Sequence, residues 1–400
     1  MPRRWWLAAW ALLLVTLGSG TLLRIQWTGV VPAWFNSRYL LHAHSHVALL
    51  GWAFVAYFGL LFRDSRFARP RWGSLVCELL LLALIGALFV AYLYQGYAFW
   101  SIVLSALHIL VTLALVWLWV EGPRRRLTAA ARSWIDLSAL WLVVSTVGPL
   151  MLAGGVPMGA VWIDAWVGYY LTLLFNGWLL FGVVGLLVDR FGVDASADVD
   201  GVPNPWVRRL MAVGVIPGVL PRFDPWITLP GLDWIGWVGL ALVGGGLVVV
   251  AVRLHLGEAA PGDGAATTAL PRRWLAHSVR VAMALTGVAV VVGGFPPLTD
   301  TLAGAHNLVI GFVHLHLLAF VTAALVLLLY RTGWAAGVLF LGGVWGMVAV
   351  LLGVGVFELL GRPVFWPVQQ VLAVAGVLAL MGVALLPLAG GGEGRLDQAD

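Results

Sequence analysis

The sequence predicts an all-α, polytopic integral membrane protein, folded as a single transmembrane domain over residues 1–400. Of the 400 residues, 62% are hydrophobic and only 10% are charged, whereas soluble domains carry about 25% charged residues. One crossing of a bilayer needs about 20 mostly apolar residues. Segments of that kind follow one another along the whole chain, so the sequence predicts about twelve transmembrane helices and no separate soluble domain.

Twelve segments are apolar enough and near enough to this length to be expected as spans. They cover roughly residues 5–22, 39–62, 73–95, 98–120, 133–154, 163–188, 205–221, 233–254, 274–295, 301–330, 334–357 and 366–389. The first is taken as a retained span, because no small-residue cleavage site ends it. The seventh is the weakest, since it contains Pro217. The single cysteine, Cys77, excludes an intramolecular disulfide and a thiolate metal cluster.

The arginines predict the orientation of these spans. With the N-terminus inside, eighteen arginines fall in inner segments and four in outer loops, as positive-inside bias requires. The outer four are Arg24, Arg38, Arg222 and Arg362. We therefore expect a multi-pass protein of a bacterial inner (plasma) membrane with both termini in the cytoplasm and flexible inner loops at about 189–204 and 255–272. The arginines lie in short loops, where membrane orientation explains them, so nucleic acid is not expected as a partner.

Six of the nine histidines form two clusters inside long apolar segments. One cluster is His42, His44 and His46 in the second expected span; the other is His306, His314 and His316 in the tenth. Ionisable side chains are costly inside a membrane and mark functional sites there. Both spans run from outside to inside in the predicted orientation, so both clusters lie in the outer half. The pattern predicts that the two spans meet around a shared metal or haem.

Helical geometry divides each cluster between faces. Successive residues are about 100° apart around a helix, so His42 and His46 share one face and His44 points nearly opposite. His314 and His316 also point to opposite sides, which would let one helix ligate two centres. Neutral imidazole is a common ligand of haem iron and of copper or zinc. The single histidines His108 and His277 are expected to be helix–helix hydrogen-bond partners.

The tenth-span motif HNLVIGFVHLH resembles the tenth helix of the catalytic subunit of haem-copper oxidases and nitric oxide reductases. That helix has a histidine, a second one eight residues later and a third two residues further, as do His306, His314 and His316. The resemblance implies an oxidase-like bundle with one or two b-type haems. By carry-over, His316 and one of His42, His44 or His46 would hold a low-spin haem, while His314 would face a second site.

The resemblance also implies where the haem propionates lie. In the family they point to the outer side, where Arg38 and Arg362 are expected here, although membrane-interface anchoring explains these arginines equally well. Which histidine of the second span is the ligand stays open. His42 and His46 together could instead bind a metal themselves.

The sequence departs from the family at the copper site. The family's copper ligands are a sixth-helix histidine and a histidine pair on the seventh helix. Here the sixth span has Asn176 and no histidine, and the seventh has none either, so copper is not expected at the usual site. A second resemblance, to haem- and copper-containing membrane proteins of the nitrite and nitric oxide response, rests on the His-Ala-His opening and the span count.

These patterns favour a membrane haem protein that carries electrons or binds a small gas (NO or O2). If it is an enzyme, it is a respiratory oxidoreductase without oxygen-reductase activity. Quinol or a cytochrome c-like donor and further membrane subunits are the partners that the resemblance implies. The alternative is a non-redox transporter whose two histidine clusters handle a metal ion or protons.

Overall fold

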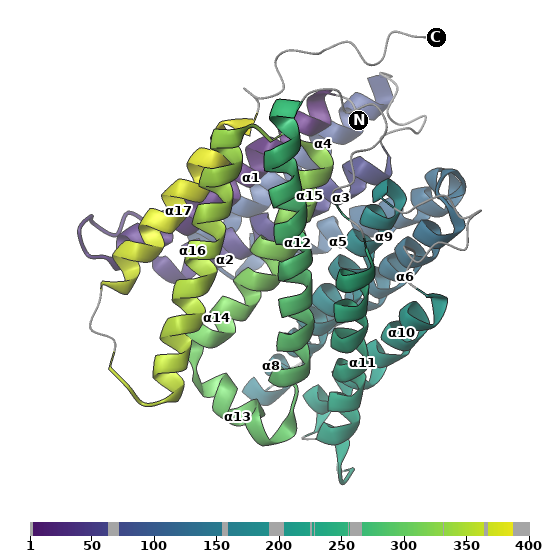
Figure 1. Cartoon of the computed structure of the whole chain (residues 1–400), viewed down its shortest axis with the longest axis vertical. Helices are drawn as coiled ribbons and strands as arrows, with labels where there is room; N and C mark the ends of the chain where they lie inside the picture. The colour runs from purple at the N-terminus through teal and green to yellow at the C-terminus, as the bar shows by residue number, and fades with distance from the viewer. Residues whose placement is uncertain are drawn as a thin grey trace.

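The computed structural model is helical throughout the part of the chain that it describes (Figure 1). The described residues are 3–62, 72–153, 159–191, 204–224, 226–227, 229–254, 256, 266–330, 332–363 and 367–386. The α-helices are α1 (Arg3–Trp27), α2 (Ser37–His46), α3 (Phe54–Leu61), α4 (Trp72–Gln95), α5 (Phe99–Glu121), α6 (Ala129–Ser145), α7 (Val147–Ala153), α8 (Ala160–Thr172), α9 (Leu180–Phe191), α10 (Pro205–Val219), α11 (Leu232–Arg253), α12 (Ala266–Gly293), α13 (Pro296–Gly304), α14 (His306–His314), α15 (Ala323–Leu329), α16 (Trp334–Leu359) and α17 (Val368–Ala384).

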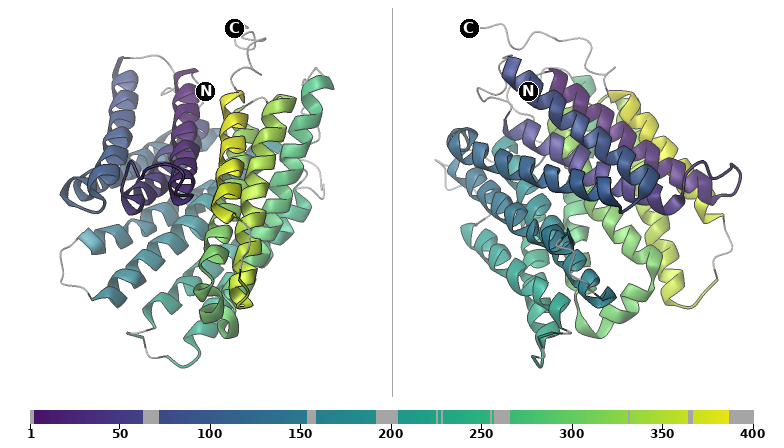
Figure 2. Two further views of the ribbon diagram at one scale, coloured as in Figure 1. Left: turned by 90° about the vertical axis from the view of Figure 1, so that its left-hand side faces the viewer. Right: turned by 180° about the vertical axis from the view of Figure 1, so that it is seen from behind.

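Ten helices among the described residues are long and apolar enough to cross a membrane, counting helices that continue through a short irregular turn as one. The chain is therefore a polytopic helical membrane protein by length and composition. The seventh and twelfth expected spans correspond to shorter helices, α10 with 15 residues and α17 with 17. Figure 2 shows that α1 begins and α17 ends at the same end of the molecule.

One expected connector is partly helical. The prediction of a loop over 255–272 is wrong at its C-terminal end, because α12 already begins at Ala266. The run from Ala266 to Leu270 contains no helix-breaking residue, and the helix continues through Pro271, its sixth residue, although proline cannot donate a backbone hydrogen bond there. The predicted loop at 189–204 and the rest of this one lie largely outside the described residues.

The first and last helices pack against each other and close the bundle. The indole of Trp10 in α1 donates a hydrogen bond of 3.0 Å to the carbonyl of Val383 in α17. Elsewhere small residues allow neighbouring helices to approach closely: Gly244 in α11 and Gly287 in α12 each lie against the carbonyl of the other. Such contacts replace hydrophobic burial as the source of helix association within a membrane.

Three spans contain a turn of π-helix at their middle. These turns are η1 (Val47–Ala53) in the second span, η4 (Leu173–Leu179) in the sixth and η6 (Leu315–Thr322) in the tenth. Insertions of this kind change the course of a helix and are frequent at functional sites. His46 and His314 directly precede two of them, and Asn176 lies inside the third.

Beyond these π-helical turns the three spans converge. The C-terminal halves α3, α9 and α15 pack against one another, whereas no comparable contact joins the N-terminal halves α2, α8 and α14 within the described chain. Trp52 and Thr322 fix the junction, because the Trp52 indole donates a buried hydrogen bond of 3.1 Å to the Thr322 hydroxyl. The second and tenth spans are thus joined in their C-terminal halves.

Candidate functional site

His44 is held by the first helix. Its Nδ1 lies 3.0 Å from the carbonyl oxygen of Thr16 and 3.3 Å from the hydroxyl of Ser19. The ring lies against Gly20, where an added Cβ would come within 2.8 Å of Cε1. A carbonyl only accepts, so Nδ1 carries the proton and Nε2 keeps its lone pair. A ligating histidine needs such a second hydrogen bond to fix its tautomer and orientation.

His314, at the end of α14, has the same arrangement. Its Nδ1 lies 2.8 Å from the carbonyl oxygen of Ile310, so its Nε2 also keeps a lone pair. His314 is close enough to His44 to interact with it electrostatically. Protein atoms surround both rings, yet both residues keep accessible surface.

Arg24 completes this group and was not recognised from the sequence, which placed it in an outer loop. It lies in α1, is only 7% exposed, and interacts electrostatically with both His44 and His314. Its guanidinium donates to Gln369 Oε1 at 3.2 Å and lies 5.0 Å from the centre of the Trp27 ring. No carboxylate among the described residues pairs with it. A buried cation without an anion is costly unless a ligand supplies one.

His42 and His46 point away from this group. The His46 ring stacks on Tyr92 with 3.8 Å between centres, and the His42 ring meets the edge of Tyr97 at 4.6 Å. The Nδ1 of His46 donates to the carbonyl of His42, and its Nε2 lies 3.5 Å from the Tyr97 hydroxyl. Both ring nitrogens of His46 therefore have partners. His42 and His46 both lie against Tyr92 or Tyr97, whereas His44 lies against the first helix.

His316 faces the sixth span. It is fully buried among the rings of Phe175, Phe312 and Phe320, with centres 5.6 to 6.1 Å away. Neither ring nitrogen has a hydrogen-bond partner in the described structure. An unpaired buried polar side chain of this kind calls for an explanation. The carry-over expected His316 to approach the second span, but the histidine that does so here is His314.

The remaining expected residues lie at the surface. His306, Arg38 and Arg362 are all exposed, and Arg38 interacts electrostatically with His42 rather than with His44. In the part of the chain that the structure describes, no group of three or more His, Cys, Asp or Glu side chains is placed to hold a metal ion. The site is therefore a pair of histidines with an arginine, not a polydentate metal cluster.

Neighbouring helices supply donors to the π-helical turns. His108 Nε2 lies 3.0 Å from the carbonyl oxygen of Leu50 in η1, and Ser138 Oγ donates at 2.8 Å to the carbonyl of Trp178 in η4. A π-helical turn frees backbone carbonyls, which must be satisfied within a membrane. The expectation that His108 is a helix–helix hydrogen-bond partner is confirmed. His277 is exposed and is considered below.

A comparison of the chain with models of known protein families found no match, and a comparison with curated proteins found no relative.

Proposed function

We propose that the protein is a membrane haem protein in which the imidazoles of His44 and His314 would hold a b-type haem between the second and tenth spans. The observation that carries this proposal is the matched pair of imidazoles. Each has Nδ1 bonded to a backbone carbonyl, each has a free Nε2, and the two are near each other. Neutral imidazoles in this state are the usual ligands of haem iron.

Arg24 supports the same site. A haem carries two carboxylates, and a buried guanidinium without an acidic partner offers one of them a charge-assisted hydrogen bond. Ser19 and Thr16 hold the ring of His44, and Ile310 holds that of His314. When bound, a haem supplies one-electron transfer or, with an open coordination position, binding of a small gas.

The sixth span gives no second set of metal ligands. Asn176 lies in η4 with its Oδ1 buried and unpartnered, as are both nitrogens of His316. An amide oxygen is a poor substitute for imidazole at copper. The residues present therefore support electron transfer by haem, in an oxidase-like bundle of the bacterial inner membrane, and not a family-type copper centre. With both imidazoles bound, gas binding would require one of them to dissociate. Quinol or a cytochrome c-like protein is the proposed donor, and further membrane subunits remain proposed partners.

Absorption spectroscopy of the purified protein tests this function. We expect a Soret band, α-bands on reduction, and a pyridine haemochromogen of b type. A colourless protein produced with excess haem precursor would overturn the proposal and favour the alternative, a transporter that uses its histidines for metal ions or protons. Equilibrium dialysis with copper and zinc would then test the alternative.

A further inference from the structure

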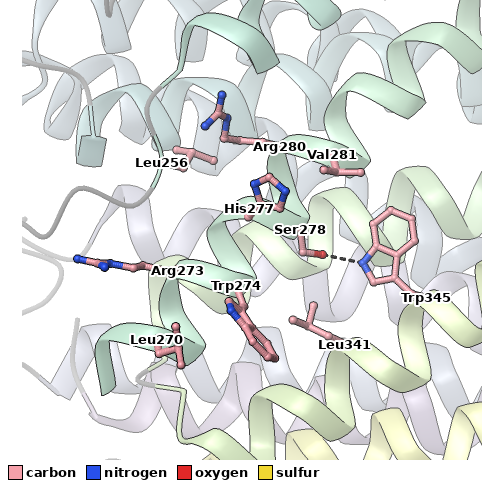
Figure 3. A pocket seen from close by; sticks show the side chains of 10 residues that line it. All are labelled: Leu256, Leu270, Arg273, Trp274, His277, Ser278, Arg280, Val281, Leu341 and Trp345. Carbon is pink, nitrogen blue, oxygen red and sulfur yellow. Dashed lines mark hydrogen bonds between the residues drawn. The ribbon is translucent and has the colours of Figure 1, made fainter. Parts of the chain in front are cut away.

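A second site lies far along the chain from the histidine pair, between α12 and α16. It is a pocket of about 900 Å³ lined by Leu256, Leu270, Arg273, Trp274, His277, Ser278, Arg280, Val281, Leu341 and Trp345. Figure 3 shows that its basic side chains and its tryptophans lie on successive turns of neighbouring helices. From Leu270 to Val281 the pocket follows α12 for about 16 Å, at about 1.5 Å per residue.

Basic and apolar side chains alternate along the pocket, because both kinds come from successive turns of α12. Arg273, His277 and Arg280 line it, and no acidic residue does. Arg280 is fixed by hydrogen bonds to the carbonyls of Ala251 and Val252 at the end of α11. Arg273 and His277 are exposed. The charge of the pocket is therefore positive and is not balanced by its own lining.

The apolar part is exposed on the surface that would face lipid. Leu270, Trp274 and Val281 are 49%, 48% and 37% exposed. The pocket ends on Trp345, whose indole N–H is already used in a hydrogen bond of 2.7 Å to Ser278 (Figure 3). The indole N–H of Trp345 therefore needs no partner from a ligand, and Val281, Leu341 and Trp345 offer apolar surface to a hydrocarbon chain. Trp274, in ring contact with Trp334 at 4.9 Å, has the place of an interfacial aromatic residue.

We propose that this pocket binds an anionic phospholipid of the cytoplasmic leaflet. Its phosphate lies between Arg273 and His277, and an acyl chain follows Leu270, Trp274 and Val281 towards Trp345. The predicted orientation puts the start of α12 on the cytoplasmic side, and basic pockets between transmembrane helices on that side suit anionic headgroups. An anionic lipid fits better than a zwitterionic one, because no acidic side chain is present to pair with a choline or an amine. The proposal does not depend on haem binding.

Native mass spectrometry of the delipidated protein in detergent tests the proposal. The probes are phosphatidylglycerol, phosphatidylcholine with the same acyl chains, and inorganic phosphate. We expect phosphatidylglycerol to bind with one tight site per chain, phosphatidylcholine to bind far more weakly, and phosphate alone not to displace the lipid. Equal binding of the two lipids, displacement by inorganic phosphate, or a quinone retained in place of the lipid would each overturn the proposal.

Variants locate the site. Arg273→Gln with His277→Gln should weaken phosphatidylglycerol binding by fivefold or more, the change expected from about 1 kcal/mol per basic side chain near the surface. Arg125→Gln with Arg126→Gln removes two exposed arginines from another inner segment and should leave binding unchanged. Val281→Trp fills the groove without altering charge and should also weaken binding. An equal loss in the Arg125 and Arg126 control, or full binding by Val281→Trp, would show that the pocket is not the site.

Discussion

The ring of His44 lies against Gly20 of the first helix, so close that an added Cβ would meet Cε1 at 2.8 Å and Nδ1 at 3.1 Å. The same helix holds Nδ1 through the Thr16 carbonyl and the Ser19 hydroxyl. The orientation of His44 is therefore set by α1, a helix that carries no histidine. A ligand bound to Nε2 would depend on this contact. A substitution at Gly20 can therefore move the His44 ring without removing the histidine.

Gly20→Ala should weaken haem binding while keeping every histidine. The methyl group displaces the His44 ring, since such contacts are shorter than side chains tolerate. Gly18→Ala is the matched control on the same helix, because an added Cβ there meets nothing within 4 Å. Both changes gain the same helix propensity, up to about 1 kcal/mol. Haem content per chain and the reduced α-band measure the result; equal haem content in the two variants would contradict the role of this contact.

The two histidines of the tenth span should behave differently. His314→Ala should remove the low-spin haem spectrum, because His314 is near His44 and has a free, oriented Nε2. His316→Ala should leave that spectrum, since His316 faces Phe175 of the sixth span. The resemblance to oxidases predicts the opposite result. Reduced-minus-oxidised spectra of the two variants at equal protein concentration decide between the geometry and the family pattern.

The sequence was sufficient for the helical membrane character of the chain. Runs of about 20 apolar residues located the ten long apolar helices of the described chain, while two of the twelve expected spans are shorter helices. Two-residue spacing separated the directions of His42 and His44. The π-helical turns were not predictable, because LHLLAFVT has neither Gly nor Pro and the single Gly51 of VALLGWA is tolerated in a regular helix. Those turns rotate the helix beyond them. An ideal helix therefore could not predict which of His314 and His316 faces the second span and which faces the sixth.

Arg24 shows a second limit of the sequence. It lies near the outer end of the first helix, where an arginine ordinarily faces lipid headgroups or water. Burial came from packing against α17, which brings Gln369 to its guanidinium. That contact joins residues 345 positions apart, and no local pattern announces it. Arg38, the arginine that sequence position favoured, is exposed.

Ser138→Ala should destabilise the protein, and Ser133→Ala on the same helix should not. Ser138 Oγ donates to the carbonyl of Trp178 in the π-helical turn of the sixth span and is bonded to Tyr57. Its loss leaves a buried carbonyl without a donor, which costs about 1–3 kcal/mol. Ser133 Oγ bonds only to Ala130 within its own helix. Unfolding in graded detergent mixtures measures both variants; equal stability would mean that the carbonyl finds another donor.

Arg24→Gln should lower the midpoint potential of the bound haem. The oxidised haem has one more positive charge than the reduced haem, so a nearby guanidinium favours reduction, and its removal favours oxidation. A charge interaction of about 1–2 kcal/mol, typical of a dielectric constant near 20, corresponds to about 40–80 mV for one electron.

Arg38→Gln is the control, because an exposed charge is screened by salt and should shift the potential much less. The apoprotein should not lose stability in Arg24→Gln, since a buried cation without an acidic partner is removed and the Gln side chain can still donate to Gln369. We therefore expect redox titration to show a lower midpoint potential and unfolding of the apoprotein to show no loss of stability. An unchanged potential in Arg24→Gln, or a lower potential only together with an unfolded apoprotein, would mean that Arg24 supports the fold and does not face a haem.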